Sequence, residues 1–199
     1  MTLTDHDRTL LRLSTAIVLG RWDELRRLRA GAGPDEPDRA WREAVLQTHV
    51  FAGFPRLVEA YQELAAVGGL GATEPGEKEV EDDPSARGRA LFDRIYADDA
   101  GDVRALLAGT DPLFATWIAE YAYARVLSRP GLSADRRELL AVCALAALGQ
   151  GRQLASHTRG SLRCGAEPAE VAEAIECVSD LLTPDDLERA RAVIAHFTS

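Results

Sequence analysis

Cysteine is scarce and widely scattered in this sequence. The three cysteines lie at positions 143, 164 and 177, and no two of them are close enough along the chain to form a motif. An odd number with wide spacing excludes the disulfide framework of small secreted domains and gives no zinc motif. Cys143 lies within the apolar run 141–148, where a small buried residue is expected. Cysteine spacing therefore predicts neither a metal site nor a disulfide.

Positive charge and long apolar runs are also missing. Lysine occurs once, at Lys78, the formal net charge is -9 and the isoelectric point is near 5.0. Without a basic patch to neutralise phosphates, a nucleic-acid partner and a polybasic membrane anchor are both excluded. No stretch of about eighteen apolar residues predicts a membrane span. The first twelve residues lack the apolar core of a signal peptide, so we expect a cytoplasmic protein.

Helix signals fill most of the remaining sequence. The composition, with 46% hydrophobic and 28% charged residues, is typical of a globular protein, and the alternation expected of strands is absent. Glycine and proline mark the ends of the amphipathic segments. The pattern predicts an all-α fold with helices over 10–19, 21–29, 38–50, 57–66, 86–97, 102–108, 112–127, 133–148, 152–164, 168–182 and 184–197.

One segment departs from this pattern. Residues 67–84 contain several glycines, two prolines and the acidic run 77–83, which is typical of a flexible, solvated linker. We therefore divide the chain into an N-terminal helical unit (1–70), an acidic Gly/Pro linker (71–85) and a C-terminal unit (86–199) that carries the candidate site.

The two halves resemble each other at a nearly constant offset. Residues 10–20 align with 139–149 at a shift of 129, including a glycine at the end of each segment, and Glu43-Ala-Val aligns with Glu173-Ala-Ile at a shift of 130. This order predicts two tandem helical repeats, although two helices rich in Leu and Ala can also align by chance. At the positions of Glu138 and His157 the first repeat has Thr9 and Leu28. The first repeat is therefore expected to be structural.

Glu138 and His157 are the strongest candidates for chemistry. Each lies on a predicted helix, with the Gly149 turn between the two helices, so antiparallel packing could bring the side chains together. A carboxylate beside an imidazole fixes its tautomer and raises its pKa, giving an acid or base near neutral pH. The alternative from spacing alone is a surface glutamate and a solvated histidine.

Several short motifs resemble the carboxymuconolactone decarboxylase and alkyl hydroperoxidase D superfamily. They occur in the same order as in that superfamily: RPGLSADRRELL at 129–140, QLASHTRG at 153–160, CGA at 164–166 and EVAEAI at 170–175. The first half adds EAVLQ at 43–47 and FAGFP at 51–55. The stronger resemblance covers 87–182 and the weaker one 10–64. It implies an alkyl hydroperoxidase D-like helical fold of two tandem repeats.

The peroxidase branch of this superfamily uses a glutamate, a Cys-x-x-Cys pair and a histidine. Glu138 and His157 fall at the matching spacing, but the two cysteine positions hold Gln150 and Gln153. Peroxide reduction by that route needs one thiolate to attack and a second thiol to resolve, and glutamine does neither. The resemblance therefore leaves a peroxiredoxin activity as the disfavoured alternative.

The decarboxylase branch needs no metal and no organic cofactor, and it implies loss of carbon dioxide from a small lactone or unsaturated acid. The resemblance then makes His157 the donor or acid, oriented by Glu138. Further candidates for contact with an anionic substrate are Arg152, Arg159, Gln150, Gln153 and, from the first half, His49. His49 has the alternative of a buried structural histidine, and the arginines that of solvated helix residues. A non-catalytic relative that keeps only the fold is the third hypothesis.

The expected partners follow from the same resemblance. They are a small-molecule substrate and further copies of the chain, because a duplicated chain of this superfamily is expected to form a trimer. A dimer is the alternative. Tyr121, Tyr123 and Trp117 are interpreted as core or interface aromatics, with lining of the pocket as the alternative.

Overall fold

The computed structural model describes residues 2–33, 36, 38–77 and 83–198. All regular elements in these ranges are helical, so the predicted all-α class is confirmed. The α-helices are α1 Asp5–Leu19, α2 Trp22–Ala30, α3 Arg39–Gln47, α4 His49–Ala66, α5 Pro84–Tyr96, α6 Ala100–Thr110, α7 Pro112–Trp117, α8 Ala134–Ala147, α9 Gly151–Cys164, α10 Pro168–Cys177 and α11 Pro184–Thr198. A π-helix, η2 (Ile118–Leu127), continues α7, and the short 3-10 helices are η1 (Ala97–Asp99) and η3 (Ser179–Leu181).

Local signals explain where these helices begin and bend. Asp38 caps α3 as predicted, because its carboxylate accepts a hydrogen bond from the Trp41 amide at 3.0 Å. Ser133 occupies the predicted cap of α8, but its side chain makes no capping bond. The helix predicted over 38–50 is interrupted, because α3 ends at Gln47 and α4 begins at His49. Helix α4 is itself kinked at Gly53, where φ is +80°. A positive φ of this kind is readily adopted only by glycine.

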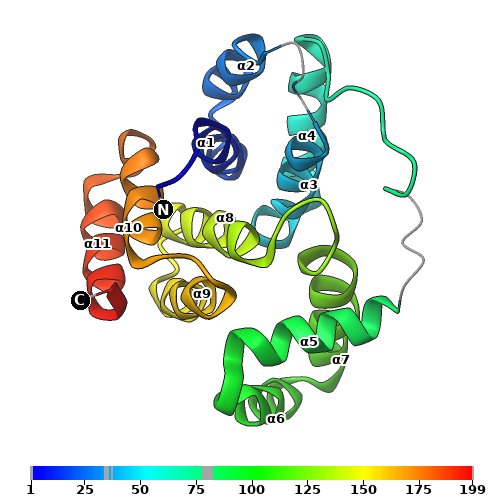
Figure 1. Ribbon diagram of the computed structural model, residues 1–199, viewed down its shortest axis with the longest axis vertical. Helices are drawn as coiled ribbons and strands as arrows, with labels where there is room; N and C mark the ends of the chain where they lie inside the picture. The colour runs from blue at the N-terminus through cyan, green and yellow to red at the C-terminus, as the bar shows by residue number, and fades with distance from the viewer. Residues whose placement is uncertain (1, 34–35, 37, 78–82, 199) are drawn as a thin grey trace.

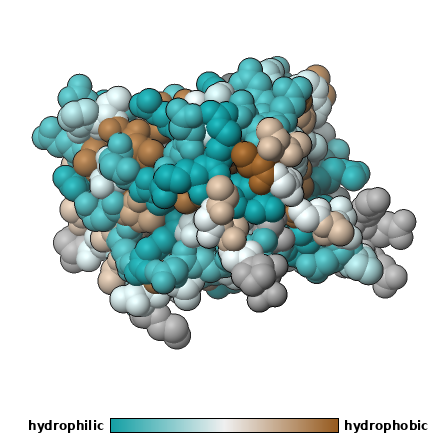
Figure 2. All heavy atoms as spheres, turned by 90° about the horizontal axis from the view of Figure 1, so that it is seen from above, coloured by the Kyte–Doolittle hydropathy of each residue, from teal (hydrophilic) through white to brown (hydrophobic). Residues whose placement is uncertain are grey.

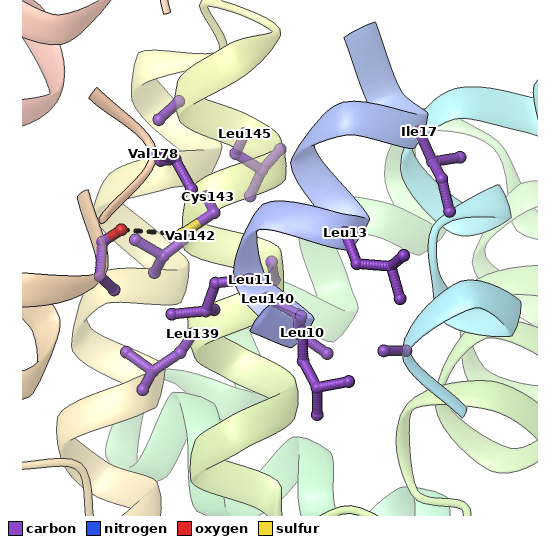
Figure 3. Close-up of a cluster of buried hydrophobic side chains, with 14 of the residues drawn as sticks. Leu10, Leu11, Leu13, Ile17, Leu139, Leu140, Val142, Cys143, Leu145 and Val178 are labelled. Atoms are coloured by element: carbon purple, nitrogen blue, oxygen red, sulfur yellow. Dashed lines mark hydrogen bonds between the residues drawn. The ribbon is translucent and has the colours of Figure 1, made fainter. Parts of the chain in front are cut away.

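The main core lies between α1 and α8, which cross near the centre of the molecule (Figure 1). Leucines from both helices interleave there, with Cys143 buried among them as predicted (Figure 3). A second, smaller cluster is formed by α5 and η2 with Cys164 of α9, and it contains Leu91, Phe92 and Tyr123. Helices α5, α6 and α7 therefore form a separate layer that packs on α9.

One turn of the backbone recurs at the offset of the predicted repeats. Gly20 and Gly149 end α1 and α8 with the same φ of 67°. After each glycine, the next amide donates to a carbonyl five residues back: Arg21 to Ala16 at 2.8 Å and Gln150 to Leu145 at 3.0 Å. Elements α1–α4 correspond in order to α8–α11, whereas α5–η2 lie between the two sets. These features fit the predicted repeat, which stays a prediction.

Two ion pairs cross between the repeats in a reciprocal way. Arg8 of α1 donates from Nε to Glu173 of α10 at 3.0 Å, and Arg137 of α8 donates from Nη2 to Glu43 of α3 at 2.8 Å. The arginines are 129 residues apart and the glutamates 130, as in the sequence alignment. Each predicted repeat thus supplies the arginine to one pair and the glutamate to the other, which is the pattern expected if the two are related by an approximate two-fold axis.

The linker differs from its prediction at its middle. Residues 71–74 are exposed loop, but Glu77 is buried and forms an ion pair with Arg42, and its carbonyl accepts a bond from Arg129 at 2.9 Å. Paired carboxylates can be buried because their partners replace the hydration that they lose. The acidic run is therefore not wholly solvated, and its residues 78–82 lie outside the described ranges.

The surface is hydrophilic over most of the face seen from above, with separate hydrophobic patches (Figure 2). Within the described residues, no helix is both long enough and apolar enough to cross a bilayer.

Candidate functional site

Glu138 and His157 meet in the structure. Helices α8 and α9 pack against each other after the turn at Gly149, and His157 Nδ1 lies 2.9 Å from Glu138 Oε2. Both residues are almost fully buried, with 8% of His157 and 1% of Glu138 exposed. The geometry required for the proposed chemistry is present, and the catalytic roles stay predictions.

The contact with Glu138 shifts the pKa of the His157 imidazole. Burial alone disfavours the charged ring and lowers its pKa, but the charge of Glu138 and its hydrogen bond act in the opposite direction. The pKa of His157 is raised above its ordinary value of 6.5 as a result. A carboxylate can only accept a hydrogen bond here, so Nδ1 is the donor. The other ring nitrogen, Nε2, hydrogen-bonds no side chain within the described residues, so it is the atom left for a substrate.

Gly160 makes room for the Glu138 carboxylate. A Cβ atom at this position would lie 2.5 Å from Glu138 Oε2 and 3.0 Å from Cγ2 of Ile95. Both distances are shorter than normal van der Waals contacts. The second carboxylate oxygen, Oε1, is buried and has no hydrogen-bond partner among the described residues. Glu138 is therefore held at one oxygen by His157 and tightly confined by its neighbours.

We expect Gly160→Ala to displace Glu138. Alanine favours a helix over glycine by about 1 kcal/mol, but overpacking typically costs about 1–3 kcal/mol. The net result should be lower stability in urea unfolding, together with a lower pKa of His157 measured by NMR, because the carboxylate moves away.

The matched control is Gly101→Ala on α6, where a Cβ would meet no atom within 4 Å. It should leave the pKa of His157 unchanged and should not destabilise the protein. Equal behaviour of the two variants would contradict the packing role of Gly160.

Two tyrosines and a thiol interact electrostatically with the Glu138 carboxylate, which we did not predict. Tyr123 donates to the hydroxyl oxygen of Tyr96 at 3.4 Å, and burial raises the pKa of both phenols, with a smaller contribution from the charge of Glu138. Burial, assisted by the same charge, raises the pKa of Cys164 to about 12. In the sequence, Gly160, three residues after His157, is the feature that indicates close packing around Glu138.

The remaining second-half candidates lie on different sides of α9. Gln150 and Gln153 are both exposed. Gln153 precedes His157 by about one turn and shares its face of α9, whereas Gln150 is the residue before the helix begins. Arg152 and Arg159 are also exposed, but their spacing places them on other faces. Arg159 lies over the ring of Phe197, at 5.7 Å from the centroid, and 4.0 Å from Asp99. The structure therefore favours Gln153 over the arginines as a neighbour of His157.

The first half contributes Phe51 rather than His49. The ring of Phe51 meets that of His157 edge-on, with 6.1 Å between centroids. His49 instead donates from Nδ1 to the Leu46 carbonyl and accepts at Nε2 from the Tyr121 hydroxyl at 2.7 Å. The buried, structural alternative for His49 thus fits its contacts.

The three aromatics of the α7–η2 segment have different environments. Tyr123 is buried as predicted, whereas Trp117 is 61% exposed and Tyr121 is partly exposed. Trp117 is therefore no core residue of the single chain. Within the described residues, no cluster of three side chains is suited to hold a metal ion.

Comparison with known protein families gives a match to part of the chain. No curated protein matches the chain significantly. Residues 112–195 match the model of the carboxymuconolactone decarboxylase family, a segment that runs from α7 into α11 and contains Glu138 and His157. The match begins and ends later than the strong resemblance at 87–182. The resemblance inferred from the sequence is therefore confirmed for residues 112–195, which are similar to the carboxymuconolactone decarboxylase family.

Proposed function

We propose that the chain is a cofactor-free lyase that decarboxylates a small lactone or unsaturated acid, with His157 as its acid. The observation that carries this proposal is the buried hydrogen bond between His157 and Glu138, which raises the pKa of the imidazole. A histidine that stays protonated near neutral pH is suited to donate a proton to carbon.

The proposed reaction has two coupled changes. The bond between the ring carbon and the carboxylate breaks, carbon dioxide leaves, and the electron pair moves into the conjugated lactone to form an enolate. His157 then transfers the Nε2 proton to carbon and regains a proton from water. Glu138 acts as a positioning residue, because it holds Nδ1 and compensates the imidazolium charge. Gln153, one helical turn before His157, is the candidate donor to the enolate oxygen.

The peroxidase alternative is weaker in this geometry. Gln150 and Gln153 replace the two thiols, and none of the three cysteines is an activated thiolate. Burial raises the pKa of Cys143, Cys164 and Cys177, whereas reactive cysteines have a lowered pKa. A peroxidase assay with a dithiol reductant should show no turnover.

The test is ultraviolet-monitored turnover of 4-carboxymuconolactone. We expect the wild-type protein to consume it and His157→Gln to be slower by about 10²–10⁴-fold, the usual contribution of a general acid. The control His196→Gln changes an exposed histidine on α11 and should keep full activity. If the wild type consumes no lactone, or if His157→Gln is as fast, the proposed reaction is wrong, and the non-catalytic alternative gains weight.

We also propose that the chain is a tandem repeat that assembles with further copies of itself. Exposed aromatic and aliphatic side chains lie on α4 and on α7–η2, and the rings of Phe54 and Tyr121 connect the two sets at 6.5 Å between centroids. Exposed apolar surface of this kind often marks an interface. Light scattering that gives the mass of a monomer would contradict the assembly.

A further inference from the structure

A groove between α5, α6 and the α7–η2 segment lies outside the His157 site. Its volume is about 360 Å³, within the range of small-molecule pockets. Its walls are largely apolar, with Phe92 from α5, Leu107 from α6 and Ile118 and Tyr123 from η2. Tyr123 also interacts electrostatically with Glu138, whereas the other three residues are not part of the proposed catalytic machinery.

The groove stays open because small residues line it. Ala108, Ala115 and Ala119 leave space where larger side chains would close the three walls. At Gly88, α5 approaches η2 so closely that a Cβ would lie 2.6 Å from Cα of Ala124. The backbones therefore fix the distance between the walls, and the alanines leave the space between them empty.

One wall is built from an uncommon backbone. Residues 118–127 form a π-helix, and Ile118, Ala119, Glu120 and Tyr123 of this segment face the groove. π-helical turns are rare and are frequently found at functional sites. The π-helix in this wall therefore supports a functional role of the groove, independently of the volume of the groove.

Charge at the groove favours an anion. Two arginines, Arg89 and Arg104, line it against one carboxylate, Glu120, in a chain of net charge -9. Arg89 forms no ion pair with any residue in the described part of the chain. Arg104 lies over the Phe92 ring at 4.7 Å and pairs with Asp93, but both partners are about half exposed. Such a surface pair is weak, so a ligand carboxylate can replace Asp93.

We propose that this groove binds a small apolar molecule that carries one carboxylate. The apolar part lies between Phe92, Leu107 and Ile118, and the carboxylate binds the guanidinium groups of Arg89 and Arg104. The proposal concerns binding alone and does not depend on the reaction at His157.

The experiment is calorimetric titration of the whole chain with octanoate. We expect binding with a negative heat-capacity change, because apolar surface is buried. Ala119→Trp should abolish binding, since position 119 is exposed and its larger side chain would fill the groove without disturbing the core. Arg89→Ala should weaken binding about tenfold through the loss of a charge-assisted contact, and 1-octanol should bind the wild type correspondingly weakly.

The matched control is Arg125→Ala, which removes the same charge from an exposed position of η2 outside the groove. It should leave octanoate binding unchanged. The proposal is overturned by absence of octanoate binding, by equal binding to Ala119→Trp, or by equal loss in both arginine variants. Dissociation of an oligomer by Ala119→Trp, seen by light scattering, would instead assign the groove to a second copy of the chain.

Discussion

Glu138→Gln should lower turnover at neutral pH by about 10²-fold or more, the range expected when a general acid loses its function. The variant keeps the shape of the side chain but removes the negative charge 2.9 Å from Nδ1. In the variant, burial still lowers the pKa of the imidazole, but the negative charge of Glu138 no longer raises it. His157 should become a neutral histidine at pH values where the wild type is protonated.

The pH profile separates this effect from simple misfolding. Activity that needs protonated His157 falls as pH rises through the pKa of that group. In the wild type this fall should lie above pH 6.5, because the pKa is raised, and in Glu138→Gln it should move to lower pH. Glu170→Gln changes an equally buried glutamate that pairs with Arg136 on another side of α8, and it should leave the profile in place. Unchanged profiles in both variants would show that Glu138 does not act through His157.

Stability should follow the same pKa shift. A group whose pKa is raised on folding stabilises the native state fully below its unfolded pKa, and this contribution is lost as pH rises through the folded value. For His157 the contribution is therefore complete below about pH 6.5. The difference in unfolding free energy between the wild type and Glu138→Gln should be largest there and decrease at higher pH.

The sequence contained enough to predict the helices and the main pair, for clear physical reasons. Helical periodicity and the glycine at 149 indicated two packed helices, and the spacing of Glu138 and His157 then allowed contact. The contact itself depended on the register of α8 against α9, which is compatible with Gly160 because a Cβ atom there would lie 2.5 Å from Glu138 Oε2. Periodicity does not specify register between helices.

Other parts of the site depended on tertiary packing. His49 was a reasonable candidate by residue type, but the kink at Gly53 turns Phe54 back onto its ring, with 5.1 Å between centroids. Phe51 reaches His157 from the same helix. Tyr96 and Tyr123 come from α5 and η2, and no pattern in the sequence relates these two elements to α8. Their approach depends on the small residue at Gly88, whose role is visible only when both backbones are placed.

The largest expected change in stability lies at the reciprocal ion pairs. Arg137 and Glu43 each expose 2% of their side chains, and Arg137 also donates to Gln47 at 3.0 Å and to the Arg129 carbonyl at 2.8 Å. Removing one partner of a buried pair leaves an uncompensated charge and typically costs about 3–5 kcal/mol. Glu43→Ala, which leaves the buried Arg137 without a carboxylate, should lower the unfolding free energy by about that amount in urea titrations. Arg137→Ala should cost less, because Glu43 keeps its ion pair with Arg129 at 2.8 Å.

The pseudo-equivalent pair provides the control. Arg8 and Glu173 have the same residue types at matching positions of the repeat, but their side chains are 38% and 26% exposed. Water screens this pair and can solvate either partner, so Arg8→Ala should change stability little. Equal losses at Arg8 and Arg137 would mean that burial does not distinguish the two pairs.

A double variant then separates charge from packing. Glu43→Leu combined with Arg137→Met replaces the buried pair by apolar side chains and leaves neither charge without its partner. It should be more stable than either single alanine variant, because such replacements are often neutral or stabilising. Arg129 limits how much stability the double variant can recover, because its Nη2 donates to Glu43 at 2.8 Å. The double variant removes this carboxylate from Arg129 but leaves its hydrogen bond to the Glu77 carbonyl. If the double variant regains the full unfolding free energy of the wild type, Arg129, which is more exposed than Arg137, is solvated without cost. If it regains only part of that free energy, Glu43 holds two arginines in place.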